Sequence, residues 1–251
     1  MASEEEITEP LVKALSRRVK KAPETPKERD PLDRFYTDDR LARLIAEQAC
    51  RMAPDARTFL EPSSGGGAFL RAMRLAWGLQ AGSNYKLSSG AHMPDDGCWA
   101  IHAIDIDPGA MEPAESMSAQ FVNLPFLEWR GPPAGGYDVI LANPPFAAPP
   151  LPGKDRGEPI AAAHVLHALG MLSAGGVMAC LIRQSFLATQ ERAQLFARYC
   201  PAAVDMLVER PSFTADGKTD QHEYCVIYWQ RESRLLFRRP ESTVLRWMSW
   251  K

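Results

Sequence analysis

The tetrapeptide Asn143-Pro144-Pro145-Phe146 carries the groups needed to recognise a planar amine. Its asparagine offers a side-chain carbonyl as a hydrogen-bond acceptor and an amide as a donor. Its two prolines restrict the backbone and have no N–H group, so they present carbonyl acceptors only. Phe146 adds a flat aromatic face. These groups suit a nucleobase or an amide, although an asparagine before prolines is also typical of a turn that ends a strand.

The elements on either side predict where this tetrapeptide lies. Residues 137–142 form an apolar, partly β-branched run that is typical of a buried strand, and residues 147–157 are rich in Pro, Gly and Ala. Ligands of open α/β sheets bind at the carboxyl ends of the strands. We therefore expect the tetrapeptide at the rim of a pocket.

A second group, Glu61-Pro62-Ser63-Ser64-Gly65-Gly66-Gly67, follows a short apolar run, 58–60, and precedes a predicted helix, 68–77. A strand, a glycine turn and a helix in this order form the first unit of a doubly wound fold. Glycines allow a ligand to approach the backbone closely. An acid ahead of the glycines would repel a pyrophosphate but suits an ammonium group and hydroxyls, which favours S-adenosylmethionine over NAD.

Two further segments carry candidate binding groups. The predicted strand 99–104 ends in Asp105-Ile106-Asp107-Pro108, where an acid can accept hydrogen bonds from ribose hydroxyls and Asp107 can cap the next helix. Phe35-Tyr36-Thr37 precedes an amphipathic helix whose N-terminal N–H groups favour a carboxylate. A hydrophobic staple with a helix cap explains this last segment equally well.

The remaining periodicity predicts an α/β fold of Rossmann-like type, with a seven-stranded, mostly parallel sheet and helices on both faces. His164 and His167 fall within one predicted helix without a nearby carboxylate, so we expect them to pack rather than to bind a metal. The predicted strands are 58–60, 99–104, 119–122, 137–142, 175–182, 204–208 and 224–229, and the later helices are 160–172 and 186–199.

Together these blocks resemble the class I S-adenosylmethionine-dependent methyltransferases, specifically the N6-adenine DNA methyltransferases with the gamma order of motifs. The run from Arg210-Pro211-Ser212-Phe213 to Trp229 is also similar to compact enzymes of phages and mobile elements. The resemblance implies that Asn143, Pro144, Pro145 and Phe146 are catalytic. It implies that the cofactor S-adenosylmethionine is bound by Tyr36, Thr37, Glu61, Pro62, Ser63, Gly65, Gly67, Asp105, Ile106, Phe126 and Asn143, and that no metal is needed.

The chain departs from this family at one position. The family usually has an aspartate before the Phe-Leu pair that follows its third strand, whereas Pro125 precedes Phe126 here.

The expected reaction is an in-line displacement by the N6 amine of a flipped-out adenine. Its protons would bond to the Asn143 side chain and the Pro144 carbonyl.

Composition sets the wider expectations. With 251 residues and a formal net charge of −2, the chain has no global basic character, so DNA contacts must be local. We expect a charged arm over residues 1–32, a catalytic domain over 33–230 and a basic segment over 231–251. The start is no signal peptide, and no run is long enough to span a membrane. A cytoplasmic protein of a bacterium or a phage-infected cell is expected.

No separate target-recognition domain is expected either. Recognition would come from loops at 78–97, 147–157 and 210–223, from the ends of the chain, or from a partner subunit or homodimer. Three alternatives to a DNA substrate remain open: methylation of RNA adenine, methylation of a protein glutamine amide, and a non-catalytic cofactor-binding subunit. The amide reaction usually pairs the Asn-Pro-Pro motif with Tyr rather than Phe.

Overall fold

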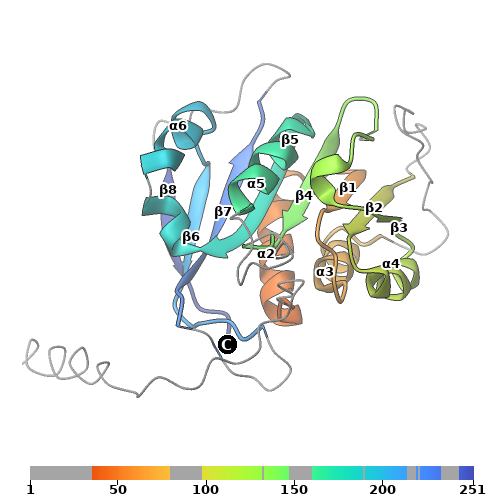
Figure 1. Cartoon of the computed structure of the whole chain (residues 1–251), viewed down its shortest axis with the longest axis horizontal. Helices are drawn as coiled ribbons and strands as arrows, with labels where there is room; N and C mark the ends of the chain where they lie inside the picture. Colours follow the sequence, from red (N-terminus) through yellow and green to blue (C-terminus); the bar gives the residue numbers. More distant parts are fainter. Residues whose placement is uncertain are drawn as a thin grey trace, which may run out of the picture. The chain divides into compact units, whose positions relative to one another are not determined.

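Eight strands form one sheet with the order β3-β2-β1-β4-β5-β7-β6-β8 (Figure 1). The computed structural model describes residues 36–79, 98–131, 133–146, 160–188, 190–213, 219, 221–232 and 243–251. The predicted arm at 1–32, Phe35, the loop at 147–157, most of the loop at 78–97, and residues 214–218 and 220 of the loop at 210–223 lie outside these residues. The strands are β1 Thr58–Glu61, β2 Ala100–Asp105, β3 Gln120–Asn123, β4 Tyr137–Ala142, β5 Leu172–Arg183, β6 Ala203–Leu207, β7 Tyr224–Gln230 and β8 Val244–Met248.

The first five strands run parallel, and β7 is antiparallel to both of its neighbours. The α-helices are α2 Asp39–Met52, α3 Ala68–Ala76, α4 Met111–Ser116, α5 Ala161–Gly170 and α6 Gln190–Arg198. The 3-10 turns are η1 Pro108–Ala110, η2 Phe126–Glu128 and η3 Gln184–Ala188. The Rossmann-like α/β fold is thus confirmed, with helices on both faces of the sheet.

The central strands are apolar on both sides because helices cover both faces of the sheet. On β4, Val139 and Leu141 pack in one core with residues of α2 and α3. Ile140 and Ala142 point the other way, into a core with residues of α5 and α6. This alternation, continued along β5 and β7, is why the strands read as continuous apolar runs.

One strand was missing from the sequence prediction. Val244–Met248 lies within the segment that we assigned to a basic end, but it forms β8, parallel to β6 at the edge of the sheet. Arg246 of β8 makes an ion pair with Asp205 of β6, and Asp205 is buried. The expected seven strands are therefore eight. An edge strand with an arginine at its centre and mostly exposed side chains lacks the apolar alternation that predicts a strand.

Among the described residues, none of the helices combines the length and the apolar character that crossing a bilayer requires. None of the five cysteines, all of which lie in the described part of the chain, forms a disulfide.

Gly136, just before β4, gives a test of the packing between β4 and β5. Its φ is 100°, and a Cβ there would lie 2.7 Å from both the Met171 carbonyl oxygen and the Ser173 nitrogen. Gly136→Ala should lower the free energy of unfolding by about 3 kcal/mol, through backbone strain and overpacking together.

Gly175→Ala is the matched control. Gly175 has a φ of 82°, but a Cβ there would have no heavy atom of the described residues within 4 Å. The substitution should cost only the conformational strain, about 1 kcal/mol. Urea unfolding of both variants measures the difference. Equal losses would show that the close backbone approach at Gly136 contributes nothing.

Candidate active site

A pocket of about 270 Å³ opens where β1 and β4 end, beside the start of α2. Glu61 is the last residue of β1, and Asn143 directly follows β4. Thr37 lies two residues before the first residue of α2. Segments far apart in the sequence therefore meet at one rim. The lining residues are Tyr36, Thr37, Glu61, Ser63, Ser64, Gly65, Gly66, Ala68, Arg71 and Asn143.

The glycine turn forms one wall of this pocket. Gly65 and Gly67 have φ values of 43° and 72°, in the left-handed region that glycine adopts without strain. Gly67 is also the N-terminal cap of α3. The Tyr36 ring lies against the turn, since a Cβ on Gly66 would be 3.3 Å from the Tyr36 Cδ1 atom. Side chains at Gly65 and Gly66 would press against the Tyr36 ring.

Asp105 ties the glycine turn to the end of β2. Its Oδ2 accepts a hydrogen bond from the Gly65 N–H at 2.8 Å, and its Oδ1 accepts one from the Asp107 N–H at 2.8 Å. Burial raises the pKa of the Asp105 carboxyl. Asp105 and its neighbour Ile106, which is 39% exposed, border the turn without lining the pocket itself.

Glu61 is a buried acid on the floor of the pocket, with only 3% of its surface exposed. Its Oε2 accepts a hydrogen bond from the Leu70 N–H at 3.1 Å. Burial raises the pKa of the Glu61 carboxyl well above its usual range, and the negative charge of Asp105 raises it further. A cationic ligand group would offset this burial cost, because it favours the carboxylate form.

The Ser64 hydroxyl is a second polar group that suits a ligand. It is buried, it lines the pocket, and it has no hydrogen-bond partner among the residues that the structure describes. Buried hydroxyls normally have a partner, so a ligand with a polar group here would satisfy it.

Asn143 links the catalytic tetrapeptide to the segment before α2. Its Nδ2 donates a hydrogen bond to the Thr37 Oγ1 at 3.1 Å, between residues 106 positions apart. This bond uses the amide N–H side of the Asn143 side chain and fixes which way the amide faces. The neighbouring Pro144 is buried, and Pro145 is half-buried.

Phe146 belongs to an aromatic cluster whose contacts the sequence did not predict. The Arg183 guanidinium lies 4.0 Å from the centroid of its ring, and the Tyr224 ring lies 6.2 Å away. Tyr224 in turn contacts Phe213 at 4.9 Å. The Phe213 carbonyl accepts a hydrogen bond from the Tyr36 N–H at 3.3 Å. Only the similarity of the run that begins at Arg210 pointed to this region.

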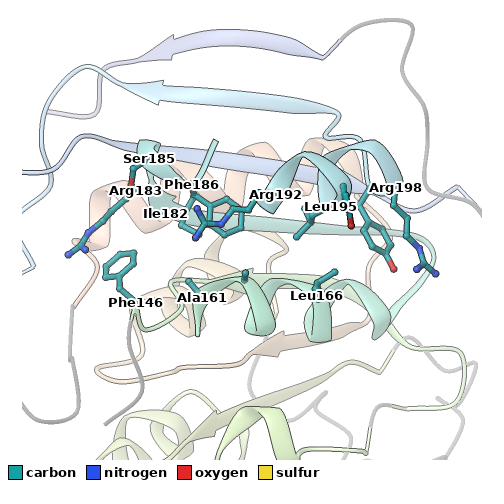
Figure 2. Close-up of a pocket in the computed structure, with 13 residues that line it drawn as sticks. Phe146, Ala161, Leu166, Ile182, Arg183, Ser185, Phe186, Arg192, Leu195 and Arg198 are labelled. Atoms are coloured by element: carbon teal, nitrogen blue, oxygen red, sulfur yellow. The ribbon is translucent and has the colours of Figure 1, made fainter. Parts of the chain in front are cut away.

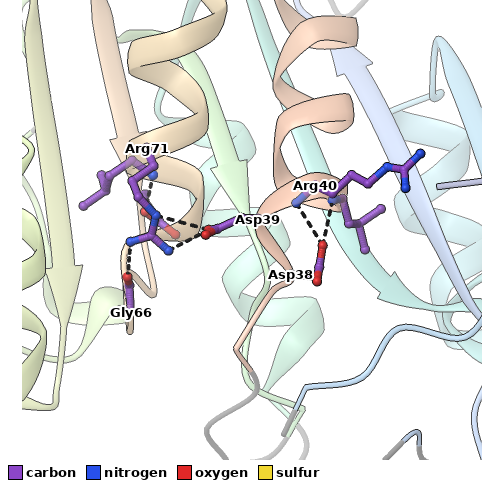
Figure 3. A network of polar contacts seen from close by, with 8 residues as sticks. Asp38, Asp39, Arg40, Gly66 and Arg71 are labelled. Atoms are coloured by element: carbon purple, nitrogen blue, oxygen red, sulfur yellow. Dashed lines mark hydrogen bonds and ion pairs between the residues drawn. The ribbon is translucent and has the colours of Figure 1, made fainter. Parts of the chain in front are cut away.

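Arg71 is another pocket residue that the sequence did not indicate. One of its terminal nitrogens donates to the Gly66 carbonyl at 2.7 Å, and the other makes an ion pair with Asp39 at 2.6 Å (Figure 3). Beside it, Asp38 caps α2 by accepting from the Arg40 N–H at 2.9 Å (Figure 3). Arg71 thus ties the glycine turn to the start of α2.

Comparisons with known proteins agree with this architecture. No protein-family model and no curated protein matches the chain. It is similar in structure to a putative class I S-adenosylmethionine-dependent methyltransferase of Listeria monocytogenes, with a TM-score of 0.59 and 14% identity, over 98% of this chain and 73% of that one. The fold is that of the class I methyltransferases.

Two other solved structures share this methyltransferase fold. A type I restriction-modification methyltransferase subunit of Streptococcus thermophilus has a TM-score of 0.58 and 18% identity, over 82% of this chain and 45% of that one. A putative RNA methyltransferase of Pyrococcus horikoshii has a TM-score of 0.55 and 13% identity, over 89% of this chain and 98% of that one. This chain therefore spans less than half of the restriction-modification subunit.

The methyltransferase fold does not bring every predicted residue to the pocket. Pro62 and Gly67 are buried behind the lining, and Phe126 lies in the core beneath α5. The Phe126 ring contacts His167 at 4.8 Å and His164 at 5.4 Å. A role for Phe126 in cofactor binding stays a prediction.

The two histidines of α5 are packed side chains. Burial lowers the pKa of His164 to about 4, so its imidazole is neutral at physiological pH. Within the described part of the chain, no group of three or more His, Cys, Asp or Glu residues has the arrangement of a metal site.

Proposed function

We propose that the chain transfers a methyl group from S-adenosylmethionine to the exocyclic N6 amine of adenine in DNA. The observation that supports this most is the position of Asn143. It follows β4 at the rim of the pocket and bonds to Thr37, with the aromatic ring of Phe146 three residues later. The tetrapeptide that begins at Asn143 contains the groups that a planar amine requires: a hydrogen-bonding amide, two proline carbonyls and a flat ring.

The pocket has groups that fit the proposed cofactor. The Glu61 carboxyl and the Ser64 hydroxyl would hold the amino-acid part. Asp105, which borders the glycine turn beside the pocket, would accept from the ribose hydroxyls. Tyr36 and Thr37 would close the pocket from the side of α2. When bound, S-adenosylmethionine supplies an electrophilic methyl group on a sulfonium leaving group.

The residues of the tetrapeptide prepare the amine. An aromatic amine is a poor nucleophile, since its lone pair is delocalised into the ring. Hydrogen bonds from its two protons to the Asn143 side-chain oxygen and the Pro144 carbonyl favour a tetrahedral nitrogen with a usable lone pair. The same acceptors stabilise the positive charge that develops on the nitrogen. After the target base has flipped out of the duplex, it stacks on the Phe146 ring.

DNA is our first choice of substrate because a restriction-modification methyltransferase subunit is among the structurally similar proteins. RNA adenine is the second candidate, favoured by the similarity to a putative RNA methyltransferase. A glutamine amide is the third. We also propose that a partner subunit or a second copy of the chain contributes to target recognition. The proposed place of the reaction is the cytoplasm of a bacterium or of a phage-infected cell.

Transfer of labelled methyl groups to purified macromolecules tests the choice of substrate. The protein and labelled S-adenosylmethionine are incubated in three separate reactions, one with unmethylated bacterial DNA, one with total RNA and one with a protein extract. Label is expected in the DNA alone. Label in RNA or protein would replace the proposed substrate, and cofactor binding without transfer to any of the three would favour a non-catalytic subunit.

A further inference from the structure

A second, larger hollow of about 490 Å³ starts at Phe146 and runs between α5 and the segment formed by η3 and α6 (Figure 2). Phe146 is shared between this groove and the catalytic tetrapeptide. The groove therefore begins where the target base would stack. Its lining residues are Phe146, Ala161, Ala162, Leu166, Ile182, Arg183, Ser185, Phe186, Arg192, Gln194, Leu195, Arg198 and Tyr199.

The upper wall of the groove in Figure 2 carries the three arginines and Phe186, whereas Phe146 lies below, on the side of Ala161. Three guanidinium groups each lie over a ring: Arg183 over Phe146 at 4.0 Å, Arg192 over Phe186 at 4.3 Å and Arg198 over Tyr199 at 5.4 Å. Stacking on a ring holds a guanidinium in place through its flat face, whereas an anion is bound through the N–H groups at its edge.

The opposite wall is apolar. It is formed by α5, which contributes Ala161, Ala162 and Leu166, and the Leu166 side chain is 44% exposed. None of the lining residues is an acid, so their charged groups are three arginines. A ligand that fits both walls must present anionic groups on one side and flat, apolar groups on the other.

A single nucleic-acid strand has this chemistry, because it repeats a phosphate and a base with every nucleotide. Grooves for single strands combine cations that follow the backbone with surfaces on which bases stack. An acidic peptide would match the arginines but not the apolar wall. The position of the groove next to Phe146 also favours a segment of the same strand that carries the target base.

We infer that this groove binds the single-stranded segment adjoining the target adenine. Arg192 and Arg198 contact its phosphates, and the wall of α5 contacts its bases. The inference rests on the proposed function, since it takes Phe146 as the surface on which the target base stacks. Because the chain has a formal net charge of −2, a nucleic-acid strand must be held by a local group of cations, and this groove provides one.

The test compares the wild type with the double variant Arg192→Gln/Arg198→Gln. The probes are a fluorescein-labelled DNA strand of about 12 nucleotides, within the site size of such grooves, and an RNA strand of the same sequence. Affinity is measured by fluorescence anisotropy between about 50 and 200 mM salt. The double variant should bind at least about tenfold more weakly. The slope of log affinity against log salt concentration should be less steep by about 1.4, because two phosphate contacts are lost.

The matched control is Arg43→Gln/Arg51→Gln, which removes the same charge from the exposed side of α2. This control should bind the strand like the wild type. S-adenosylmethionine affinity and thermal unfolding are measured for all variants, and the groove variant should match the wild type in both. The DNA and RNA arms show which nucleic acid the groove prefers.

Each failure has its own result. A wild type that methylates DNA while the groove variant keeps its affinity and salt slope would overturn the groove and leave the proposed function intact. Groove-dependent strand binding without methylation of any nucleic acid would support the groove and overturn the proposed reaction. Displacement of the strand by polyglutamate at equal charge concentration would overturn a nucleic-acid groove in favour of an acidic protein partner.

Discussion

Asn143→Ala should reduce methyl transfer by about a hundredfold to a thousandfold, the usual loss when one group that stabilises a developing charge is removed. In the proposed reaction this variant lacks the acceptor that orients the amine, but the Pro144 carbonyl and the Phe146 ring remain. The bond that Asn143 makes to Thr37 is a single one between neutral groups, and its loss affects the pocket by about 1 kcal/mol. Transfer rates at saturating cofactor and DNA measure the effect.

The affinity for S-adenosylmethionine distinguishes the chemical role of Asn143 from a structural one. It should change by less than about tenfold in Asn143→Ala, in line with the loss of one weak hydrogen bond. If transfer and cofactor binding were lost together, Asn143 would be a structural residue of the pocket, and the tetrapeptide would have no direct part in the reaction.

Glu61→Gln has opposite effects on the empty and the occupied protein. Burial raises the pKa of the Glu61 carboxyl well above its usual value in the folded state. The folded protein therefore binds more protons than the unfolded chain between the unfolded pKa, about 4.3, and the raised folded pKa. Across that window the free energy of unfolding falls as the pH rises.

Glutamine removes the free-energy cost of burying an ionisable carboxyl, because it stays neutral and its carbonyl can still accept from the Leu70 N–H. The ligand-free variant should therefore unfold at a higher temperature than the wild type at neutral pH. Its affinity for S-adenosylmethionine should fall roughly 30-fold, since a charge-assisted hydrogen bond contributes about 2 kcal/mol. Differential scanning calorimetry and titration calorimetry measure the two effects.

Glu115→Gln, at an exposed position of α4, is the control for the loss of a carboxylate. It should leave both the unfolding temperature and the cofactor affinity near those of the wild type. A Glu61→Gln protein that is less stable than the wild type and binds the cofactor equally well would contradict the assignment of Glu61 to the pocket floor.

The sequence predicted the central fold because the central strands are buried on both sides. β4 spans Tyr137–Ala142, as the apolar run predicted, and the Glu61 and Asn143 ends of β1 and β4 meet at one rim. The β8 strand was missed because an edge strand has little apolar pattern to read. Similarly, the predicted helix at 186–199 is divided into η3 and α6, which the local sequence does not indicate.

The parts of the site that were missed depend on contacts between distant residues. Arg71 reaches Asp39, 32 positions earlier in the chain, only because α3 packs beside α2. Arg183 lies over Phe146 because β5 is the neighbour of β4 in the sheet. Neither arginine stands in a motif, so residue types and spacing carry no sign of them. The groove along α5 and α6 escaped prediction for the same reason.

The most direct test of the central claim is the chemical identity of the methylated nucleoside. DNA that has been incubated with the protein and S-adenosylmethionine is digested to nucleosides and analysed by mass spectrometry. The account predicts N6-methyldeoxyadenosine, formed by the wild type and formed at least about a hundredfold more slowly by Asn143→Ala. A methylated cytosine, or unmodified DNA beside methylated RNA or protein, would contradict it.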